Sequence, residues 1–134
     1  MRAVEIRVAI NSDQDIVTAR QKGRTLASEL GFSTGDATLI ATSISELARN
    51  IVSYARRGEI TLKLVSASSR QGITIIASDR GPGIRDVRQA MRDGFSTSGS
   101  LGLGLPGVRR LMDEFEILSE PGQGTVVTVK KWKQ

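Results

Sequence analysis

The chain has 134 residues, a formal net charge of +5, and neither cysteine nor histidine. Disulfides, thiolate metal sites and histidine chemistry are therefore excluded, so a carboxylate or water must move any proton near neutral pH. Apolar residues make up 39% of the chain and charged residues 25%, as in an ordinary globular protein. We expect one domain spanning residues 1–134.

The basic balance is compatible with anionic nucleotides, acidic protein surfaces or nucleic acid. Nucleic acid is not expected, because only 4% of the residues are aromatic and the cluster of Lys130, Lys131 and Lys133 is ordinary for a solvated C-terminal segment. No apolar run approaches the roughly 20 residues that a membrane span needs, so no membrane association is predicted. The segment Met1–Ile10 is too charged and too alternating for a signal peptide. These features predict a cytoplasmic protein.

The first third of the chain predicts a strand followed by two helices. Val4–Ile10 alternates as a strand with one polar face. Ser12, followed three residues later by Asp15, is typical of a helix start, and Gly31 ends that helix. A second helix begins near residues 33–36. Its apolar stripe consists of Ala37, Ile40, Ala41, Ile44, Leu47, Ala48, Ile51 and Ala55.

The rest of the chain predicts two pairs of strands around a glycine-rich segment that runs from Asp79 to Gly104. A short helix is expected at Asp86–Met91, and a further one begins around Pro106 and runs to about Met112. The strands are Ile60–Val65, Ile73–Ala77, Phe115–Ser119 and Thr125–Lys131. This order predicts a two-layer α/β sandwich, with helices on one face of a mixed, mostly antiparallel sheet.

Glu46 and Asn50 lie four residues apart on the second predicted helix and therefore share one of its faces. A helical wheel places both near the side opposite the apolar stripe. A solvated polar face is one explanation. The other is a functional pair, because a carboxylate beside an amide oxygen suits a hard cation such as Mg²⁺.

Three glycine-containing segments follow at intervals. Asp79, Gly81 and Gly83 come directly after an apolar strand, where the carboxylate can accept from an exocyclic amine and the glycines leave room for a flat ring. An ordinary Gly-Pro turn is the alternative. Residues 99–106, with Gly102 and Gly104, precede a helix and favour phosphate binding. They form neither a P-loop nor a dinucleotide fingerprint. Residues 122–125 form a third such segment, or a simple hairpin turn.

Taken in order, these four features resemble the N, G1, G2 and G3 boxes of the GHKL family, whose members share the Bergerat fold. The resemblance spans the chain from Ser12 to Thr128. Three longer strings, at residues 45–51, 93–99 and 104–115, are similar to those of RsbT-type serine/threonine kinases of bacterial stressosome modules. Protein-kinase signatures of the His-Arg-Asp and Asp-Phe-Gly type are absent, which excludes that other kinase fold.

The resemblance implies an ATP- and Mg²⁺-dependent kinase with a defined set of site residues. Glu46 would accept or orient the proton of the attacking hydroxyl, Asn50 would hold Mg²⁺, and Asp79 would bind the adenine amino group. The other nucleotide-binding residues would be Gly81, Gly83, Gly99, Gly102, Gly104 and Thr125. Residues 85–103, from Arg85 to Leu103, would form the ATP lid. Arg49 could contact phosphate or a partner, and the sequence leaves that choice open.

The resemblance also implies partners. The substrates would be a STAS-domain antagonist and stressosome scaffold proteins, and the released kinase would activate a PP2C-type phosphatase. One alternative is an anti-sigma factor kinase that sequesters a sigma factor. Another is a regulator that binds nucleotide without transferring phosphate. Small GHKL kinases can pair through their first strand and helix, but a homodimer is not predicted.

Overall fold

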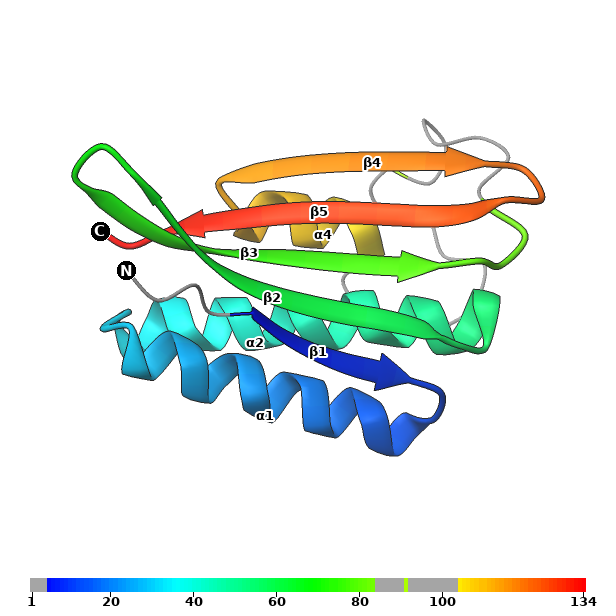
Figure 1. Ribbon diagram of the computed structural model, residues 1–134, viewed down its shortest axis with the longest axis horizontal. Coiled ribbons are helices and arrows are strands. Elements are labelled where there is room, and N and C mark those ends of the chain that lie inside the picture. Colours follow the sequence, from blue (N-terminus) through cyan, green and yellow to red (C-terminus); the bar gives the residue numbers. More distant parts are fainter. Residues whose placement is uncertain (1–4, 84–90, 92–103) are drawn as a thin grey trace.

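The computed structural model describes residues 5–83, 91 and 104–134. Helices and strands form two layers (Figure 1). The elements in chain order are β1 (Glu5–Ile10), α1 (Asp13–Glu29), α2 (Thr34–Asn50), the π-helix η1 (Ile51–Ala55), β2 (Gly58–Ala67), β3 (Arg70–Asp79), α4 (Gly104–Leu111), β4 (Glu114–Glu120) and β5 (Gly124–Trp132). The helix expected at Asp86–Met91 falls almost wholly outside the described residues.

The described strands form one sheet in the order β1-β2-β3-β5-β4, and every neighbouring pair is antiparallel. The predicted two-layer fold is confirmed. The mixed sheet that the sequence suggested is antiparallel throughout its described part. β3 lies at the centre of the sheet and ends at Asp79, beside the start of β5. This end of β3, the C-terminal end of α2 and the β4–β5 turn lie at the same end of the molecule (Figure 1).

The core lies between the sheet and the helices and is built mainly from aliphatic side chains. Alternate residues of β2 and β3, such as Leu62 and Ile75, are fully buried beneath α2, whose Ile40 and Ile44 are also fully buried. α1 packs closely on α2 at Gly23, where an added Cβ would overlap the side chain of Ile44. Glycine at this position therefore allows the two helices to approach one another.

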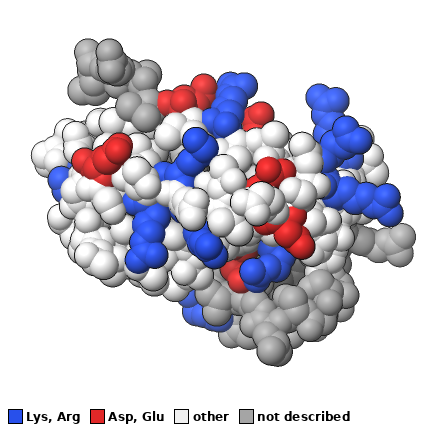
Figure 2. Space-filling view, turned by 90° about the horizontal axis from the view of Figure 1, so that it is seen from below, with Lys and Arg blue, Asp and Glu red and all other residues white. Residues whose placement is uncertain are grey.

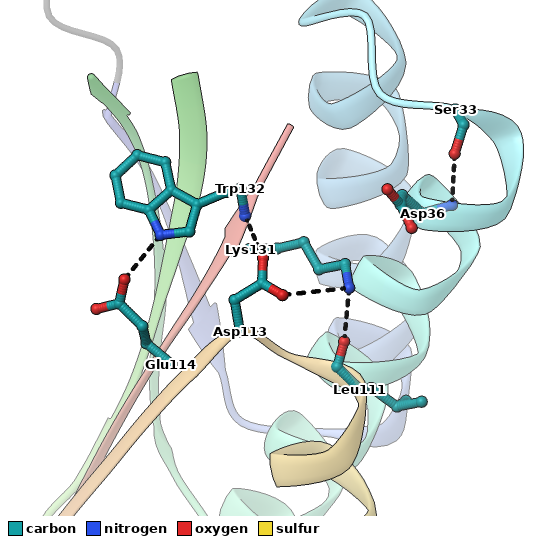
Figure 3. Close-up of polar contacts among 7 residues, drawn as sticks. All are labelled: Ser33, Asp36, Leu111, Asp113, Glu114, Lys131 and Trp132. Carbon is teal, nitrogen blue, oxygen red and sulfur yellow. Dashed lines mark hydrogen bonds and ion pairs between the residues drawn. The ribbon is translucent and has the colours of Figure 1, made fainter. Parts of the chain in front are cut away.

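α2 begins within the range that the sequence predicts, and Ser33 caps its start. The Ser33 hydroxyl accepts a 3.1 Å hydrogen bond from the backbone N–H of Asp36 (Figure 3). The start of α1 differs in detail. The Asp15 carboxylate accepts from the backbone N–H of Asn11 at 2.8 Å and from the Ser12 hydroxyl at 3.3 Å, whereas the Ser12 side chain accepts no capping bond.

The second predicted helix changes character at Asn50. α2 ends there, and the chain continues as the π-helix η1 to Ala55 before Arg56, at φ +70°, ends it. The apolar stripe that the sequence extends to Ala55 therefore crosses two kinds of helix. Short π-helical segments are rare and occur often at functional sites. Here the wider turn directly follows Asn50.

The C-terminal strand fixes the end of α4 against the sheet (Figure 3). The Lys131 ammonium donates a 3.0 Å hydrogen bond to the carbonyl oxygen of Leu111, in the last turn of α4, and lies 3.9 Å from the Asp113 carboxylate. Asp113 also accepts from the backbone N–H of Trp132 at 2.7 Å, and the Trp132 indole N–H donates to Glu114 at 2.7 Å. A cation at a helix C-terminus is favourable, so this cluster helps to hold α4 in place.

Among the described residues, no helix combines the length and the apolar character needed to cross a membrane.

Candidate functional site

Glu46 is buried, although a helical wheel places it opposite the apolar stripe of α2, so the explanation as a solvated polar face does not hold for it. Its relative exposure is 8%, and the neighbouring Ser43 and Ser45 are also buried. The wheel considers α2 alone, but α1 packs along one side of this helix and α4 contacts it as well. A buried carboxylate needs hydrogen-bond partners, so its burial requires an explanation.

The two oxygens of the Glu46 carboxylate have different partners. Oε1 accepts from Nη1 of Arg49 at 3.1 Å, one turn further along α2. Oε2 accepts from the backbone N–H of Gly104 at 3.4 Å, where α4 begins. Glu46 therefore joins the C-terminal part of α2 to the first residue of the helix that follows the glycine-rich segment. The two predicted site residues Glu46 and Gly104, 58 positions apart, are in contact.

Asp79 is the last residue of β3, and its Oδ1 accepts a 2.8 Å hydrogen bond from the backbone N–H of Gly81. Gly81 in turn packs against Ala55, at the end of η1. A Cβ at position 81 would lie 2.6 Å from the Cβ of Ala55, so no larger residue fits without movement. The loop after β3 therefore touches the helix that begins directly after Asn50.

The turn between β4 and β5 packs against the loop that follows β3. Gly83 has φ +77°, and a Cβ there would overlap the carbonyl oxygen of Glu120. Gly124 has φ +98°, and a Cβ there would overlap the carbonyl oxygen of Asp79. These two predicted turns, far apart in sequence, lie in direct backbone contact.

Thr125 pairs with Asp79 in the β3–β5 register, and Ser119 pairs with Thr125 in the β4–β5 register. Cross-strand partners point to the same face of a sheet, so these three side chains form one row. The Thr125 and Ser119 hydroxyls lie 2.8 Å apart, within hydrogen-bond distance. Ser119 was missed by the sequence analysis, because a serine near the end of a strand carries no signal until the register is known.

A groove of about 500 Å³ lies between α1 and α2 and reaches Glu46. Arg20 and Arg24 of α1 line one wall, and Thr38, Thr42, Ser45 and Glu46 of α2 line the other. Arg24 donates to the Thr38 hydroxyl at 3.2 Å. The α1 side of the molecule carries Lys and Arg side chains spread across its surface, with acidic groups between them (Figure 2).

The predicted site residues thus fall into two described groups. Glu46 and Gly104 are in contact, Asp79 and Thr125 are cross-strand partners, and η1 connects the neighbourhood of Asn50 to Gly81. Gly99, Gly102 and the predicted lid at 85–103, apart from Met91, lie outside the described residues. The roles assigned to all of these residues remain predictions.

Residues 35–134 match the family model described as histidine kinase-, DNA gyrase B- and HSP90-like ATPase. The serine/threonine-protein kinase RsbT of Bacillus subtilis (strain 168) is 56% identical over 125 residues, which cover 93% of this chain and 94% of that protein. The anti-sigma F factor of Thermoanaerobacter sp. (strain X514) is 30% identical over 127 residues, covering 92% of this chain and 89% of that protein.

Solved structures share the fold at low sequence identity. The RsbU and RsbW domains of Rv1364c from Mycobacterium tuberculosis superpose with a TM-score of 0.63 at 22% identity, over 99% of this chain and 33% of that one. The mycobacterial sensor histidine kinase MprB superposes with a TM-score of 0.59 at 16% identity, over 98% of this chain and 99% of that one. The chain belongs to the GHKL family of histidine kinase-, DNA gyrase B- and HSP90-like ATPases and, within it, to the RsbT-type serine/threonine-protein kinases.

Proposed function

We propose that this kinase transfers the γ-phosphoryl group of ATP to a serine or threonine of a STAS-domain antagonist or stressosome scaffold protein. When released from that partner, it binds and activates a PP2C-type phosphatase. The 56% identity to RsbT supports the kinase class. The observation that best supports the chemistry is the buried Glu46 carboxylate in contact with the first amide of α4.

The proposed reaction is a direct phosphoryl transfer. The hydroxyl oxygen of the partner forms a bond to the γ-phosphorus, the bond from that phosphorus to the β,γ-bridging oxygen breaks, and ADP leaves. The hydroxyl proton passes to the Glu46 carboxylate and then to solvent. Such transfers ask a protein chiefly for positioning and charge stabilisation. A carboxylate suits the proton-accepting role in a chain without histidine.

The nucleotide would lie between the two groups of site residues. Asp79 would accept from the adenine amino group, with Gly81 and Gly83 leaving room for the ring and Thr125 supporting it. At the other end, the α4 N-terminus at Gly104 would offer backbone N–H groups to the phosphates, as helix N-termini do. The amide of Gly104 now contacts Glu46, and phosphate oxygens would be alternative acceptors for it.

Asn50 fits the proposed Mg²⁺ site by its chemistry. It ends α2 one turn after Glu46, and its amide oxygen is a hard ligand of the kind that Mg²⁺ accepts. In the described part of the chain, no three acidic, histidine or cysteine side chains gather as a metal site. One or two protein ligands together with substrate phosphates are typical of Mg²⁺ in phosphoryl-transfer sites. The ion, when bound, would neutralise phosphate charge.

The groove between α1 and α2 is the proposed path of the partner's acceptor segment. It leads to Glu46, and its α1 wall carries the guanidinium groups of Arg20 and Arg24. Basic groups along this path favour an acidic segment. The acceptor would be the serine or threonine of that segment whose hydroxyl reaches Glu46 at the end of the groove.

A second candidate function is an anti-sigma factor kinase that sequesters a sigma factor. It is favoured by the 30% identity to a protein named anti-sigma F factor over nearly the whole chain. The two functions share one ATP site and differ in the protein that is held. Binding assays with purified STAS-domain, sigma-factor and phosphatase partners separate them directly.

The proposed function is tested by incubating the protein with γ-labelled ATP, Mg²⁺ and a STAS-domain partner, then mapping the modified residue by mass spectrometry. We expect one labelled serine or threonine on the partner. Glu46→Gln keeps the size of the side chain and should lower the rate by about 100-fold or more. Label that stays on the kinase alone, or a fully active Glu46→Gln variant, would contradict the proposal.

A further inference from the structure

Arg49 forms an ion pair with the carboxylate of Glu46, the proposed catalytic residue. Its Nη1 lies 3.1 Å from Oε1 of Glu46, and the side-chain exposures are 45% for Arg49 and 10% for Glu46. The remaining carboxylate oxygen, Oε2, accepts from the backbone N–H of Gly104. Both oxygens of a buried carboxylate are therefore held, one by a guanidinium on the same helix and one by the start of another helix.

We propose that Arg49 is a positioning residue for phosphoryl transfer, acting through Glu46. This inference rests on the proposed function, in which Glu46 accepts the proton of the attacking hydroxyl. A guanidinium that holds Oε1 fixes the rotation of the carboxylate and so fixes where Oε2 lies. Oε2 then faces the N-terminus of α4, where the phosphates are proposed to bind. From the sequence, Arg49 could contact either phosphate or a partner. Its ion pair with Glu46 indicates a third role.

The local structure explains why arginine serves this purpose. Glu46 and Arg49 are three residues apart on α2, a spacing that brings side chains together on a helix surface. A guanidinium is planar, always charged and donates along fixed directions, so it orients a carboxylate more strictly than a flexible ammonium group does. Asn50 follows Arg49 directly, and the helix widens into η1 at the next residue. The ion pair therefore stabilises the last turn of α2, beside the proposed metal ligand.

Loss of Arg49 has a specific expected consequence. The Glu46 carboxylate would remain largely buried, but it would lose its charged partner, and Oε2 would no longer be held in one place against the Gly104 amide. Its side-chain torsions would then be less restricted, and the proton acceptor would be misplaced for part of the time. Misplacing a reacting group by about 1 Å can cost on the order of 100-fold in rate. ATP affinity should change little, because the adenine end at Asp79 is untouched.

The test is a kinetic double-mutant cycle with γ-labelled ATP and a STAS-domain protein. Arg49→Ala should lower kcat by about 10- to 100-fold with KM for ATP within about twofold of wild type. Arg49→Lys should restore part of the rate. In a Glu46→Gln background, Arg49→Ala should cause no further loss, because residues that act as a unit are not additive. Arg7→Ala is the matched control, since it removes an exposed arginine that pairs with Glu5 at 3.5 Å on β1.

Three kinetic results would overturn the positioning role. They are an unchanged kcat in Arg49→Ala, a higher KM for ATP with kcat preserved, and an equal further loss in the Glu46→Gln background. The second result would instead assign Arg49 to the phosphates. The third would mean that Arg49 does not act through Glu46.

A second measurement does not depend on catalysis. The amide resonance of Gly104 reports the contact with Oε2, so Arg49→Ala and Glu46→Gln should both shift it, whereas Arg7→Ala should not. A Gly104 resonance unmoved by Arg49→Ala would contradict the inference. If the wild-type protein transfers no phosphate to any partner, the proposed function fails, and the Gly104 resonance alone then decides whether Arg49 positions Glu46.

Discussion

The backbone N–H of Gly122 donates a 2.6 Å hydrogen bond to the carbonyl oxygen of Pro82. This bond joins the turn between β4 and β5 to the loop that follows β3, 40 positions earlier in the chain. Gly83 and Gly124 make close backbone approaches on either side of it. The proposed adenine pocket is therefore supported by two turns that pack on each other, and Asp79 lies at their junction.

Replacement of Asp79 by asparagine should weaken ATP binding and leave the fold intact. The substitution keeps the size of the side chain and permits the bond from Gly81 N–H, but it removes the charge and introduces an NH₂ donor near the adenine amine. A mismatch of this kind costs about 1–3 kcal/mol or more, so the dissociation constant should rise by about fivefold or more. Calorimetric titration with ATP measures it.

Asp13→Asn is the control for this experiment, because Asp13 is exposed in the first turn of α1. Its ATP affinity should match that of the wild type. Equal affinity of Asp79→Asn and wild type would remove Asp79 from the adenine pocket.

Replacement of Asn50 by alanine should abolish phosphate transfer through loss of Mg²⁺ binding rather than loss of folding. Asn50 is partly exposed at the end of α2, so truncation removes little core packing. Metal-ion charge stabilisation is worth several kcal/mol, so we expect kcat to fall by at least about 100-fold. Initial rates measured over a range of Mg²⁺ concentrations, together with thermal unfolding, separate the two causes.

Asn11→Ala removes an exposed asparagine side chain and should retain the wild-type rate. A near wild-type rate of Asn50→Ala at low Mg²⁺ would show that the metal role is wrong.

The two glycines of the β4–β5 turn should respond differently to alanine. Gly124→Ala places a Cβ against the carbonyl of Asp79 in a positive-φ conformation, so it should lower the free energy of unfolding by about 2–5 kcal/mol. Gly122 also has positive φ, but no atom lies within 4 Å of an added Cβ, so Gly122→Ala should cost about 1–2 kcal/mol. Urea unfolding of both variants measures the difference. Equal losses would mean that the approach at Gly124 is not tight.

The fold was largely predictable, because the sequences of its helices and strands have strong periodic patterns and clear start and stop signals. α2 begins near Ser33 as expected, and the apolar runs of β2 and β3 form central strands. The burial of Glu46 was not predictable, because a wheel drawn for α2 cannot include the packing of α1 and α4. The change to a π-helix after Asn50 has no pattern of its own in the sequence.

The sequence predicts which residues belong to the candidate site, but it does not predict how they are arranged in space. Asp79 and Thr125 stood out by their neighbouring glycines, but their pairing depends on a strand order in which β5 inserts between β3 and β4. Ser119 joins that row through the same register and has no motif around it. Arg49 was recognised as a neighbour of Asn50, while its bond to Glu46 depends on a side-chain conformation that residue order does not specify.

The proposed switch between partners depends on mutually exclusive binding. Two surfaces are candidates for binding both partners. One is the groove between α1 and α2, and the other is formed by Arg56 and Arg57, which directly follow η1. Phosphorylation adds about −1.5 to −2 charges to the antagonist. If that group lies near Glu46, repulsion and the loss of hydroxyl contacts should weaken the complex. A loss of about 3 kcal/mol corresponds to roughly 100-fold in affinity, which would suffice to release the kinase to its second partner.

Competition between the two partners tests this account most directly. A PP2C-type phosphatase is titrated against the kinase bound to unmodified STAS-domain antagonist, and then against the kinase bound to the same antagonist after phosphorylation. We expect the phosphatase to displace the phosphorylated antagonist at concentrations about 100-fold lower. Simultaneous binding of both partners, or equal displacement of the two antagonist forms, would contradict the switch.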